Sequence, residues 1–314
     1  MAKKQTTAIG IEYDNLGIRA AEVTATPRGK DTQFNINKLE EFSGNITKDE
    51  DLIKALKKVR DKISPGKGDR IVSCVSGKQL YSAQLPFKRL PDDEIRNALR
   101  FEIRKNLPFE VSGSTIEYQF LGGSDKKGEN ADILVAAVAN ILLNRHVRNL
   151  EKGGFKPGTV DILPLAAANA FWAAHKNGNL PHANIILHVG PEISSVIIDG
   201  EDSTYYHRTI YFSAKELFGP SADPELPMRE KERRITGLTD ELVRSLSFYE
   251  TNFHAASFSV VHVLGNFLQQ ELLNVIELKT GLNVKKLDLV KALNPEMESE
   301  AGKYDLAVSL ALRE

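Results

Sequence analysis

The sequence predicts an α/β fold of two lobes, each a mixed sheet with flanking helices, and a small strand–helix–strand–strand subdomain inserted in the first lobe. Three observations support this prediction. A strand–turn–strand pattern opens the chain over residues 8–24, a similar pattern restarts at residue 183, and a separate run of strands and one helix follows residue 79. Repetition of one pattern within a chain indicates an internal duplication. The expected boundaries are 1–178 for the first lobe, about 79–150 for the inserted subdomain and 179–314 for the second lobe.

The opening pattern is a β-hairpin. Apolar residues cluster on either side of Tyr13-Asp14-Asn15-Leu16-Gly17, which has the composition of a tight turn. Thr47 followed three residues later by Glu50 has the pattern of a capping box, which predicts that a helix begins there and ends before Ser64-Pro65-Gly66. Two further strands are expected in this part of the chain, at residues 34–39 and 69–76.

The inserted subdomain is predicted from a change of pattern. Its helix carries apolar residues at every fourth position, Ile95, Leu99, Ile103 and Leu107, and charged residues on the opposite face. Because the formal net charge of the chain is −1, that charged face is interpreted as solvated rather than as a nucleic-acid contact. The expected elements are strands at 80–85, 114–121 and 132–138, helices at 91–106 and 142–152, and a polar loop at 122–130.

The second half repeats the opening pattern. An alanine-rich helix at 163–175 precedes the boundary expected at Asn179-Leu180-Pro181, and its alanines are explained by close helix packing. The proline-rich and then charged segment 219–237 is interpreted as an exposed loop that leads into a helix. The other elements expected here are strands at 159–162, 183–189, 194–198, 204–211, 259–264 and 284–287, and helices at 238–253, 269–280 and 304–312.

Composition excludes several classes of protein. A single cysteine, Cys74, excludes a disulfide framework and a cysteine-clustered zinc site, and the seven histidines include no H-x-x-x-H pair, so no metal ligands are assigned. The first residues, MAKKQTTAIG, lack the apolar run of a signal peptide, and no segment approaches about 20 apolar residues. We therefore expect a cytoplasmic protein without direct membrane insertion.

Five segments, in this order along the chain, resemble the PilM family of type IV pilus assembly. They are IGIEYDNLGIRAAEV at 9–23, LRFEIRKNLPFEVSGSTIEYQFLG at 99–122, LEKGGFKPGTVDILPLAAANA at 150–170, ELVRSLSFYET at 241–251 and YDLAVSLALR at 304–313. The resemblance implies an actin-like fold with the inserted subdomain that marks the PilM and FtsA branch. It also implies a cytoplasmic adaptor held at the inner membrane by a partner. That partner is a PilN-like single-pass protein, which connects the adaptor indirectly to PilO-like and pilus motor components.

The resemblance further implies a site for ATP with magnesium, made by three segments. The residues at the matching cofactor-binding positions are Glu12, Asn15, Gly17 and Arg19 in the first turn, Gly190, Ser194 and Ser195 in the second, and Gly265 in the third. Backbone N–H groups in side-chain-poor turns bind phosphate, and carboxylates bind magnesium.

All three segments depart from the family pattern. Asp14 replaces a glycine, Leu16 removes a hydroxyl, and His188 stands where a strand-end aspartate is expected. In the third segment the sequence Gly265-Asn266-Phe267 replaces a glycine pair, and Phe267 is expected to pack in the core. The sequence therefore predicts weak or absent nucleotide binding and assigns no catalytic residue.

The partner's cytoplasmic tail is expected in a groove between the first lobe and the inserted subdomain. Arg100, Glu102 and Phe109 are the candidate partner-binding residues, chosen because they lie on or directly after the helix of the subdomain. Three alternatives stay open at this point. They are an active ATPase or small-molecule kinase of the same superfamily, a cell-division protein like FtsA, and the related cytoplasmic component of a type II secretion system.

Overall fold

The computed structural model describes residues 5–29, 31–123, 129–175, 183–200, 205–212, 214–219, 222–223, 225–253 and 258–313. Its first sheet has the strand order β3-β2-β1-β4-β8. The hairpin strands β1 and β2 are antiparallel, β3 adds to β2, and β4 and β8 add in parallel on the other side. The bounds are β1 (Thr6–Asp14), β2 (Gly17–Arg28), β3 (Asp31–Ser43), β4 (Arg70–Val75) and β8 (Thr159–Ile162).

The second sheet repeats this topology strand for strand. Its order is β11-β10-β9-β12-β13, with two antiparallel pairings on one side and two parallel pairings on the other. The bounds are β9 (Ala183–Val189), β10 (Ser194–Gly200), β11 (Tyr205–Ile210), β12 (Val260–Gly265) and β13 (Asn283–Lys286). The predicted duplication of a mixed sheet is confirmed.

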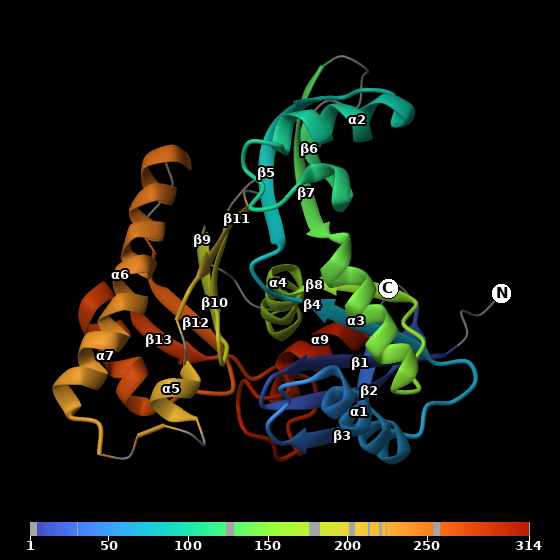
Figure 1. The fold of residues 1–314 in the computed structure, drawn as a ribbon, viewed down its shortest axis with the longest axis vertical. Helices are drawn as coiled ribbons and strands as arrows, with labels where there is room; N and C mark the ends of the chain where they lie inside the picture. The colour runs from blue at the N-terminus through green and yellow to red at the C-terminus, as the bar shows by residue number, and fades with distance from the viewer. Residues whose placement is uncertain are drawn as a thin grey trace.

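The inserted subdomain forms a third sheet of its own, in the order β5-β7-β6. Its strands are β5 (Leu80–Lys88), β6 (Ser114–Gly123) and β7 (Asn130–Ala139), and its helix is α2 (Asp92–Ile103). A short 3-10 turn, Val111–Gly113, precedes β6. Ile95, Leu99 and Ile103 are fully buried against this sheet, so the subdomain has its own apolar core. It stands above the first sheet in Figure 1.

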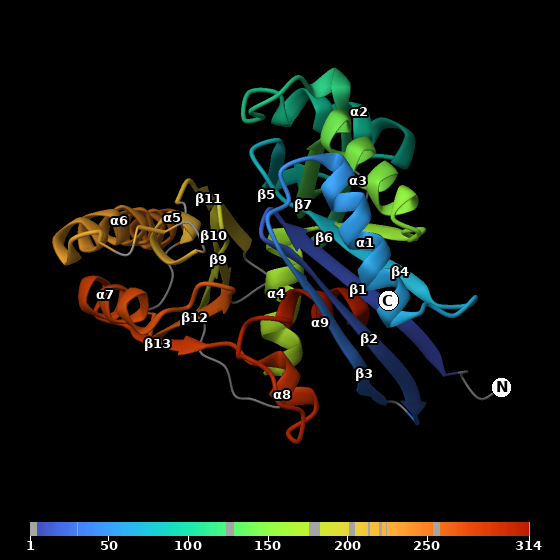
Figure 2. The same ribbon diagram turned by 60° about the horizontal axis from the view of Figure 1, so that its bottom comes forward.

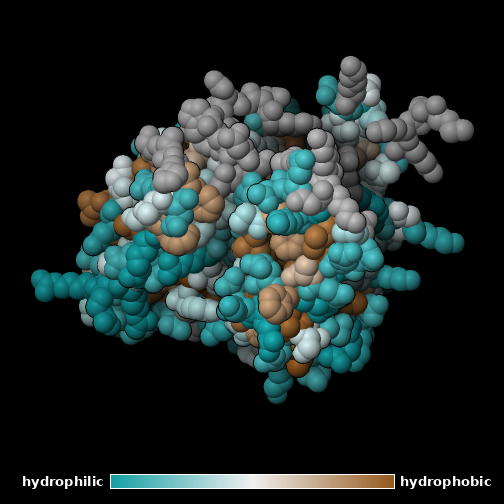
Figure 3. All heavy atoms as spheres, turned by 90° about the horizontal axis from the view of Figure 1, so that it is seen from above, coloured by the Kyte–Doolittle hydropathy of each residue, from teal (hydrophilic) through white to brown (hydrophobic). Residues whose placement is uncertain are grey.

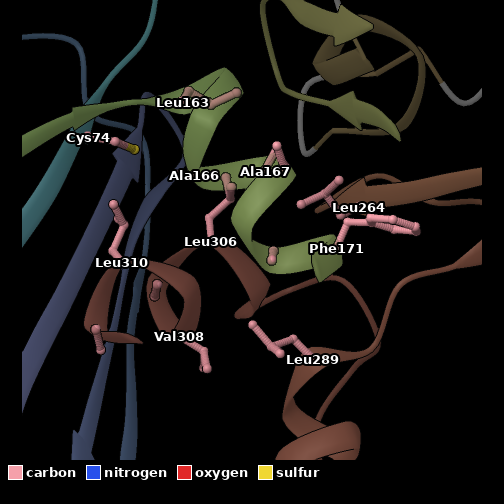
Figure 4. Packing of buried hydrophobic residues seen from close by; sticks show 14 of the residues in the cluster. Cys74, Leu163, Ala166, Ala167, Phe171, Leu264, Leu289, Leu306, Val308 and Leu310 are labelled. Carbon is pink, nitrogen blue, oxygen red and sulfur yellow. The ribbon is translucent and has the colours of Figure 1, made fainter. Parts of the chain in front are cut away.

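The core between the two large sheets is built on two helices. Figure 4 shows α4 (Leu163–Ala174) and α9 (Asp305–Leu312) side by side, with Leu306 of α9 close to Ala166 of α4. The Ser309 hydroxyl donates a hydrogen bond to the Ala166 carbonyl oxygen at 2.7 Å. Small side chains allow the two helices to approach closely, as expected from the alanine-rich sequence of α4.

Four other helices cover the outer faces of the two large sheets. Figures 1 and 2 place α1 (Asp49–Ile63) and α3 (Asn140–Lys152) on the first sheet, and α6 (Met228–Phe253) and α7 (Gln270–Thr280) on the outer side of the second sheet. The apolar stripe of α1 is buried against the first sheet, and those of α6 and α7 are buried against the second. Two short helices, α5 (Ala214–Phe218) and α8 (Leu289–Leu293), were not expected from the sequence.

Two local predictions are wrong. The capping box does not form, because Lys48 rather than Thr47 precedes the first turn of α1 and no side chain caps it. The charged segment before residue 238 is not a loop over its whole length, because α6 already begins at Met228. Glu230 forms ion pairs with Arg233 and Arg234, three and four residues later, and such pairs support a helical turn.

Part of the sequence-based organisation falls on residues that the structure does not describe. The boundary at 179–181 and residues 124–128 of the predicted loop at 122–130 lie outside the described residues. The last helix, α9, comes from the predicted second lobe but packs on β1 and β2 of the first sheet. The division into lobes at residue 179 stays a prediction.

The contact between β1 and α9 gives a first testable expectation. A Cβ atom added at Gly10 of β1 would lie 1.9 Å from the Ala307 carbonyl oxygen and 2.7 Å from the Ala311 nitrogen. Both are backbone atoms of α9, so Gly10→Ala is expected to displace this helix and to lower the free energy of unfolding by about 1–3 kcal/mol. Urea unfolding followed by circular dichroism measures the loss.

The matched control is Gly237→Ala in α6. A Cβ atom there meets no atom within 4 Å, so this change is expected to stabilise the helix by about 0.5–1 kcal/mol. Equal urea midpoints for Gly10→Ala and the unaltered protein would contradict the packing described for α9.

Figure 3 shows the surface from above as largely hydrophilic, with hydrophobic residues exposed near its middle.

Among the helices that the structure describes, none has the length and apolar content required to span a bilayer.

Candidate functional site

The candidate site is a cleft between the two halves of the molecule, at the turn of the opening hairpin. Its main part has a volume of about 1100 Å³, and an adjoining part has about 590 Å³. Residues from the first hairpin turn, from the Gly190-Pro191-Glu192 turn and from Asn266 and Phe267 line these spaces. The three segments singled out in the sequence therefore converge on one cleft.

A buried ion pair forms the base of the hairpin turn. Glu12 and Arg19 face each other across β1 and β2, and both side chains are almost inaccessible. Arg19 donates from Nε to Glu12 Oε2 at 2.5 Å and from Nη2 to Glu12 Oε1 at 2.9 Å. Burial raises the pKa of Glu12, and Arg19 opposes that rise. Burial lowers the pKa of Arg19, but its carboxylate partners raise this pKa by more than burial lowers it. Arg19 therefore stays charged.

Asp14 is the last residue of β1 and lies directly before the tip of the same turn. Its Oδ1 accepts the Leu16 backbone N–H at 2.6 Å, and its Oδ2 accepts from Arg19 Nη2 at 2.5 Å and from Asn266 Nδ2 at 3.3 Å. An aspartate that accepts from the N–H two residues later forms a local turn of its own. Donors that would face a phosphate at this turn are therefore bonded to a carboxylate of the chain itself.

The two hairpin turns are bonded to each other. Asn15 Nδ2 donates to Glu192 Oε1 at 2.9 Å, and Lys215 Nζ contacts the same oxygen at 2.6 Å. Glu192 lies in the turn between β9 and β10, so this contact joins the first sheet to the second. The sequence predicted that Glu192 lies in a turn equivalent to the first one, but it did not predict the residues that Glu192 contacts. Lys215 lies on the unexpected helix α5, and no sequence signal pointed to it.

His188, the next-to-last residue of β9, is a buried neutral group. Burial lowers its pKa to about 4, and within the described residues its Nδ1 has no hydrogen-bond partner. His188 and Gly190 line the smaller part of the cleft. Gly190 is required by the turn, because a Cβ atom there would lie 2.4 Å from the Ile193 carbonyl oxygen.

Four of the candidate cofactor-binding residues lie within sheet packing rather than on the walls of the cleft. Ser194 and Ser195 are buried in β10, opposite Val189 and His188 of β9. Gly17 is buried beside β3, where a Cβ atom would lie 2.5 Å from the Phe42 carbonyl oxygen. Gly265 has φ +130° and approaches the Val189 carbonyl oxygen. The candidates on the walls are Glu12, Asn15, Arg19 and Gly190.

Phe267 meets the expectation of a core residue. It is 9% exposed and packs in the apolar cluster of the second sheet, although one part of it also borders the cleft.

A buried hydrogen-bond chain lies under the first turn and was missed in the sequence. Tyr13 Oη and His146 Nδ1 are 2.7 Å apart, and His146 Nε2 and Ser73 Oγ are 2.9 Å apart. Burial lowers the pKa of His146 to about 4, so the imidazole is neutral. Because His146 belongs to α3, which follows β7, this chain ties the hairpin turn to the root of the inserted subdomain.

The candidate partner-binding residues have different surroundings. Arg100 Nη1 donates to the Val111 carbonyl oxygen at 3.1 Å, and Phe109 packs against the core of the subdomain. Glu102 is exposed on α2. Arg100 and Phe109 therefore also stabilise the subdomain, whereas Glu102 interacts electrostatically with Tyr81 of β5 from an exposed position.

Similarity to known proteins agrees with this architecture. A chain from a PilM–PilN type IV pilus biogenesis complex superposes on it with a TM-score of 0.76 and 20% identity, over 97% of each chain. A Bacteroides thetaiotaomicron protein with an actin-like ATPase fold and unknown function gives a TM-score of 0.51 at 11% identity, over 100% of this chain and 97% of that one. The molecule thus has the actin-like fold.

A family model provides the assignment. The model of the type IV pilus assembly protein PilM matches residues 31–218, which include β3, the whole inserted subdomain and the first half of the second sheet. Because this match covers more than half of the sequence, the chain belongs to the PilM family of type IV pilus assembly proteins.

Proposed function

We propose that this protein is an adaptor of the type IV pilus inner-membrane assembly complex and that its actin-like cleft does not hydrolyse ATP. The observation that carries the second part is the position of Asp14. Its carboxylate accepts the Leu16 N–H and two further side-chain donors at the turn where this fold would bind phosphate. The first part is supported by membership of the PilM family.

Electrostatics opposes a nucleotide at this turn. A phosphate beside Asp14 would be repelled by about 1–4 kcal/mol for one close pair of like charges. Arg19 does not offset this repulsion, because it is already shared by Glu12 and Asp14. A nucleotide would also have to break the bond between Asn15 and Glu192 that joins the two turns.

Magnesium lacks its usual ligand here. Magnesium favours carboxylate and phosphate oxygens, but the strand end carries the neutral imidazole of His188. The two carboxylates of the first strand, Glu12 and Asp14, both accept hydrogen bonds from Arg19. We therefore assign no magnesium ligand and no catalytic residue to this cleft.

Calorimetry with ATP and magnesium tests the proposal for the cleft. The unaltered protein is expected to give no saturable heat. Asp14→Gly frees the Leu16 N–H and removes one negative charge, so it is expected to raise the affinity for ATP by about tenfold or more. Asp240→Asn removes an exposed carboxylate of α6 and serves as the control.

The active-ATPase alternative makes the opposite prediction. Micromolar binding by the unaltered protein, together with turnover that Glu12→Ala abolishes, would show that the cleft is an ATPase site. An Asp14→Gly protein that is folded but no better at binding ATP would show that Asp14 is not what excludes the nucleotide.

For the adaptor role, we propose that the partner is the cytoplasmic tail of a PilN-like inner-membrane protein. A solved complex of PilM with PilN shares this fold, and this supports the choice of partner. The tail would bind beside α2 and its flanking strands, and would hold the protein at the inner membrane in contact with PilO-like and motor components through PilN.

Fluorescence anisotropy with the labelled tail of the PilN-like protein from the same organism tests this role. We expect saturable binding that Glu102→Lys weakens by about tenfold, because the exposed Glu102 is the candidate whose substitution disturbs the fold least. Leu278→Ala, at an exposed position of α7, is the control. A tail that does not bind would refute the adaptor role, and one that binds Glu102→Lys equally well would refute its placement on α2.

A further inference from the structure

A second groove lies between the inserted subdomain and the second sheet, and the proposed function does not use it. It has a volume of about 460 Å³ and runs between β5 and β11. The segment after α2 and the end of α6 complete its walls. We call it the aromatic groove, after the side chains on its rim, which include Tyr81, Tyr206, Tyr211, Phe248 and Phe253.

Buried polar contacts fix the floor of the aromatic groove. Ser82 Oγ of β5 lies 3.1 Å from Tyr205 Oη and 2.9 Å from His207 Nδ1, both on β11. Gln84 Oε1 accepts the Tyr205 backbone N–H at 2.5 Å. Side chains therefore bridge the two strands, and the shape of the groove is formed before any ligand arrives.

The topology favours an extended occupant. β5 is an edge strand of the three-stranded sheet, and β11 is an edge strand of the second large sheet. Each edge strand presents backbone groups that its own sheet does not pair, and such edges are used in proteins to bind extended peptides. A groove bordered by two strand edges suits an extended peptide segment better than a compact ligand.

The rim offers apolar anchoring positions. Tyr211 is 66% exposed, Phe248 is 48% exposed and Phe253 is 38% exposed. Neighbouring rings hold two of them in place, since Phe248 lies 5.4 Å from Tyr206 and Phe253 stacks on Tyr249 at 4.8 Å, measured between ring centroids. Ordered, exposed aromatic side chains lose little entropy on binding and frequently dominate the binding energy of an interface.

The charge of the groove favours a negatively charged ligand. The charged residues that line it, Lys78 and Arg208, are both cationic. Lys78 Nζ lies 4.9 Å from the centroid of the Tyr211 ring, on the rim. Arg208 bonds Glu241 at 2.5 Å, but Glu241 is also shared with Arg244, so positive charge remains in excess. Complementarity therefore favours an acidic residue beside an apolar anchor.

We propose that the aromatic groove binds an extended, acidic peptide segment of a second partner protein, with one large apolar side chain placed among Tyr206, Tyr211 and Phe248. The groove lining includes none of Arg100, Glu102 and Phe109, so this proposal uses other residues than the one for the PilN-like tail. The inference stands on the groove alone and does not depend on the tail.

A peptide library displayed on phage and selected on the full chain tests the proposal. Enriched peptides are expected to carry an acidic residue next to a large apolar one. A labelled peptide from this selection is expected to bind Tyr211→Ala and Lys78→Glu about tenfold more weakly or worse. Both substitutions are at exposed positions, and circular dichroism checks that they fold. Leu278→Ala, which removes an exposed apolar side chain from α7, should bind normally.

Several outcomes would overturn the proposal. These are a selection that enriches no peptide over a blank support, enriched peptides without acidic residues, or equal binding by Tyr211→Ala and Lys78→Glu. Self-association that Tyr211→Ala abolishes in light scattering would assign the groove to a second copy of the chain. Competition by the PilN-like tail would assign it to the first partner.

Discussion

Arg19→Ala is expected to lower the free energy of unfolding by about 3–5 kcal/mol, the loss typical of breaking a buried ion pair by removing one partner. Arg19 and Glu12 are 3% and 6% exposed, so Glu12 would keep a buried carboxylate without its bidentate donor. Urea unfolding at pH 7 measures the loss. The loss should shrink at acidic pH, because burial already raises the pKa of Glu12 and a protonated carboxyl needs no cation.

The matched control removes both charges. Glu12→Leu with Arg19→Met replaces the pair by apolar groups of similar size, and such replacements are often neutral or stabilising. The double variant is therefore expected to be more stable than Arg19→Ala alone. Additive losses from the two positions would show that Glu12 and Arg19 do not act as a pair.

The same pair supports the proposal that the hairpin turn does not bind a nucleotide. A cation that stabilises the fold by holding two carboxylates cannot be released to a phosphate without leaving Glu12 and Asp14 unpaired. In this turn, the requirements of stability and of nucleotide binding are in conflict. The ion pairs of Arg19 with Glu12 and Asp14 stabilise the folded turn.

The opening hairpin could be predicted because its signals are local. Tyr13 to Gly17 has turn composition, and a turn there sets the register that places Glu12 opposite Arg19. By contrast, Asn15 meets Glu192, and Asp14 meets Asn266, across more than 170 residues of chain. No spacing in the sequence encodes such contacts, because they depend on how the two sheets are placed relative to each other.

The start of α6 shows a different limit. Its first turns, from Met228, are strongly charged and are followed by Gly237, so apolar periodicity does not indicate a helix there, although Met, Arg, Glu and Lys have high helix propensity. The structure extends the helix because Glu230 pairs with Arg233 and Arg234, while Arg234 also approaches Glu216 of α5. Part of this stabilisation comes from another element and could not be inferred from a local pattern.

The order of strands and helices in the inserted subdomain could be predicted, but its hydrogen bonds to the rest of the molecule could not. Its apolar helix and three strands gave a clear pattern, and they form one small core. The hydrogen bonds that attach it, from His146 to the first hairpin and from Ser82 to β11, involve isolated polar residues. Such residues have no sequence signature, since a buried serine or histidine looks like an exposed one until its neighbours are known.

Asp305→Asn is expected to abolish much of the pH dependence of stability between about pH 4 and 7. Asp305 begins α9 and is 1% exposed, and burial raises the pKa of its carboxyl to about 7. Its Oδ1 accepts the Leu289 N–H at 3.0 Å, which lowers the pKa, while the neighbouring Asp288 raises it. Within the described residues its Oδ2 has no hydrogen-bond partner.

The sign follows from proton linkage. Between the ordinary pKa of 3.8 and about 7 the folded state binds more protons at Asp305 than the unfolded state does. The stability contributed by the protonated Asp305 is therefore fully present below pH 3.8. It is lost as the pH rises from 3.8 through about 7, by an amount on the order of 4 kcal/mol. Asparagine keeps the acceptor for the Leu289 N–H and carries no charge, so Asp305→Asn should be more stable than the unaltered protein at pH 8 and nearly equal to it below pH 3.8.

Urea unfolding of both proteins at a series of pH values isolates this contribution, because other titrating groups cancel in the difference. Asp288→Asn retains a capping side chain at the start of α8 but removes the neighbouring charge, so it should give a smaller effect in the same direction. Parallel stability curves for Asp305→Asn and the unaltered protein would mean that Asp305 is charged at low cost in the folded state. Water would then have to reach the buried Asp305 carboxylate, and the packing of α9 against the first sheet gives it no access.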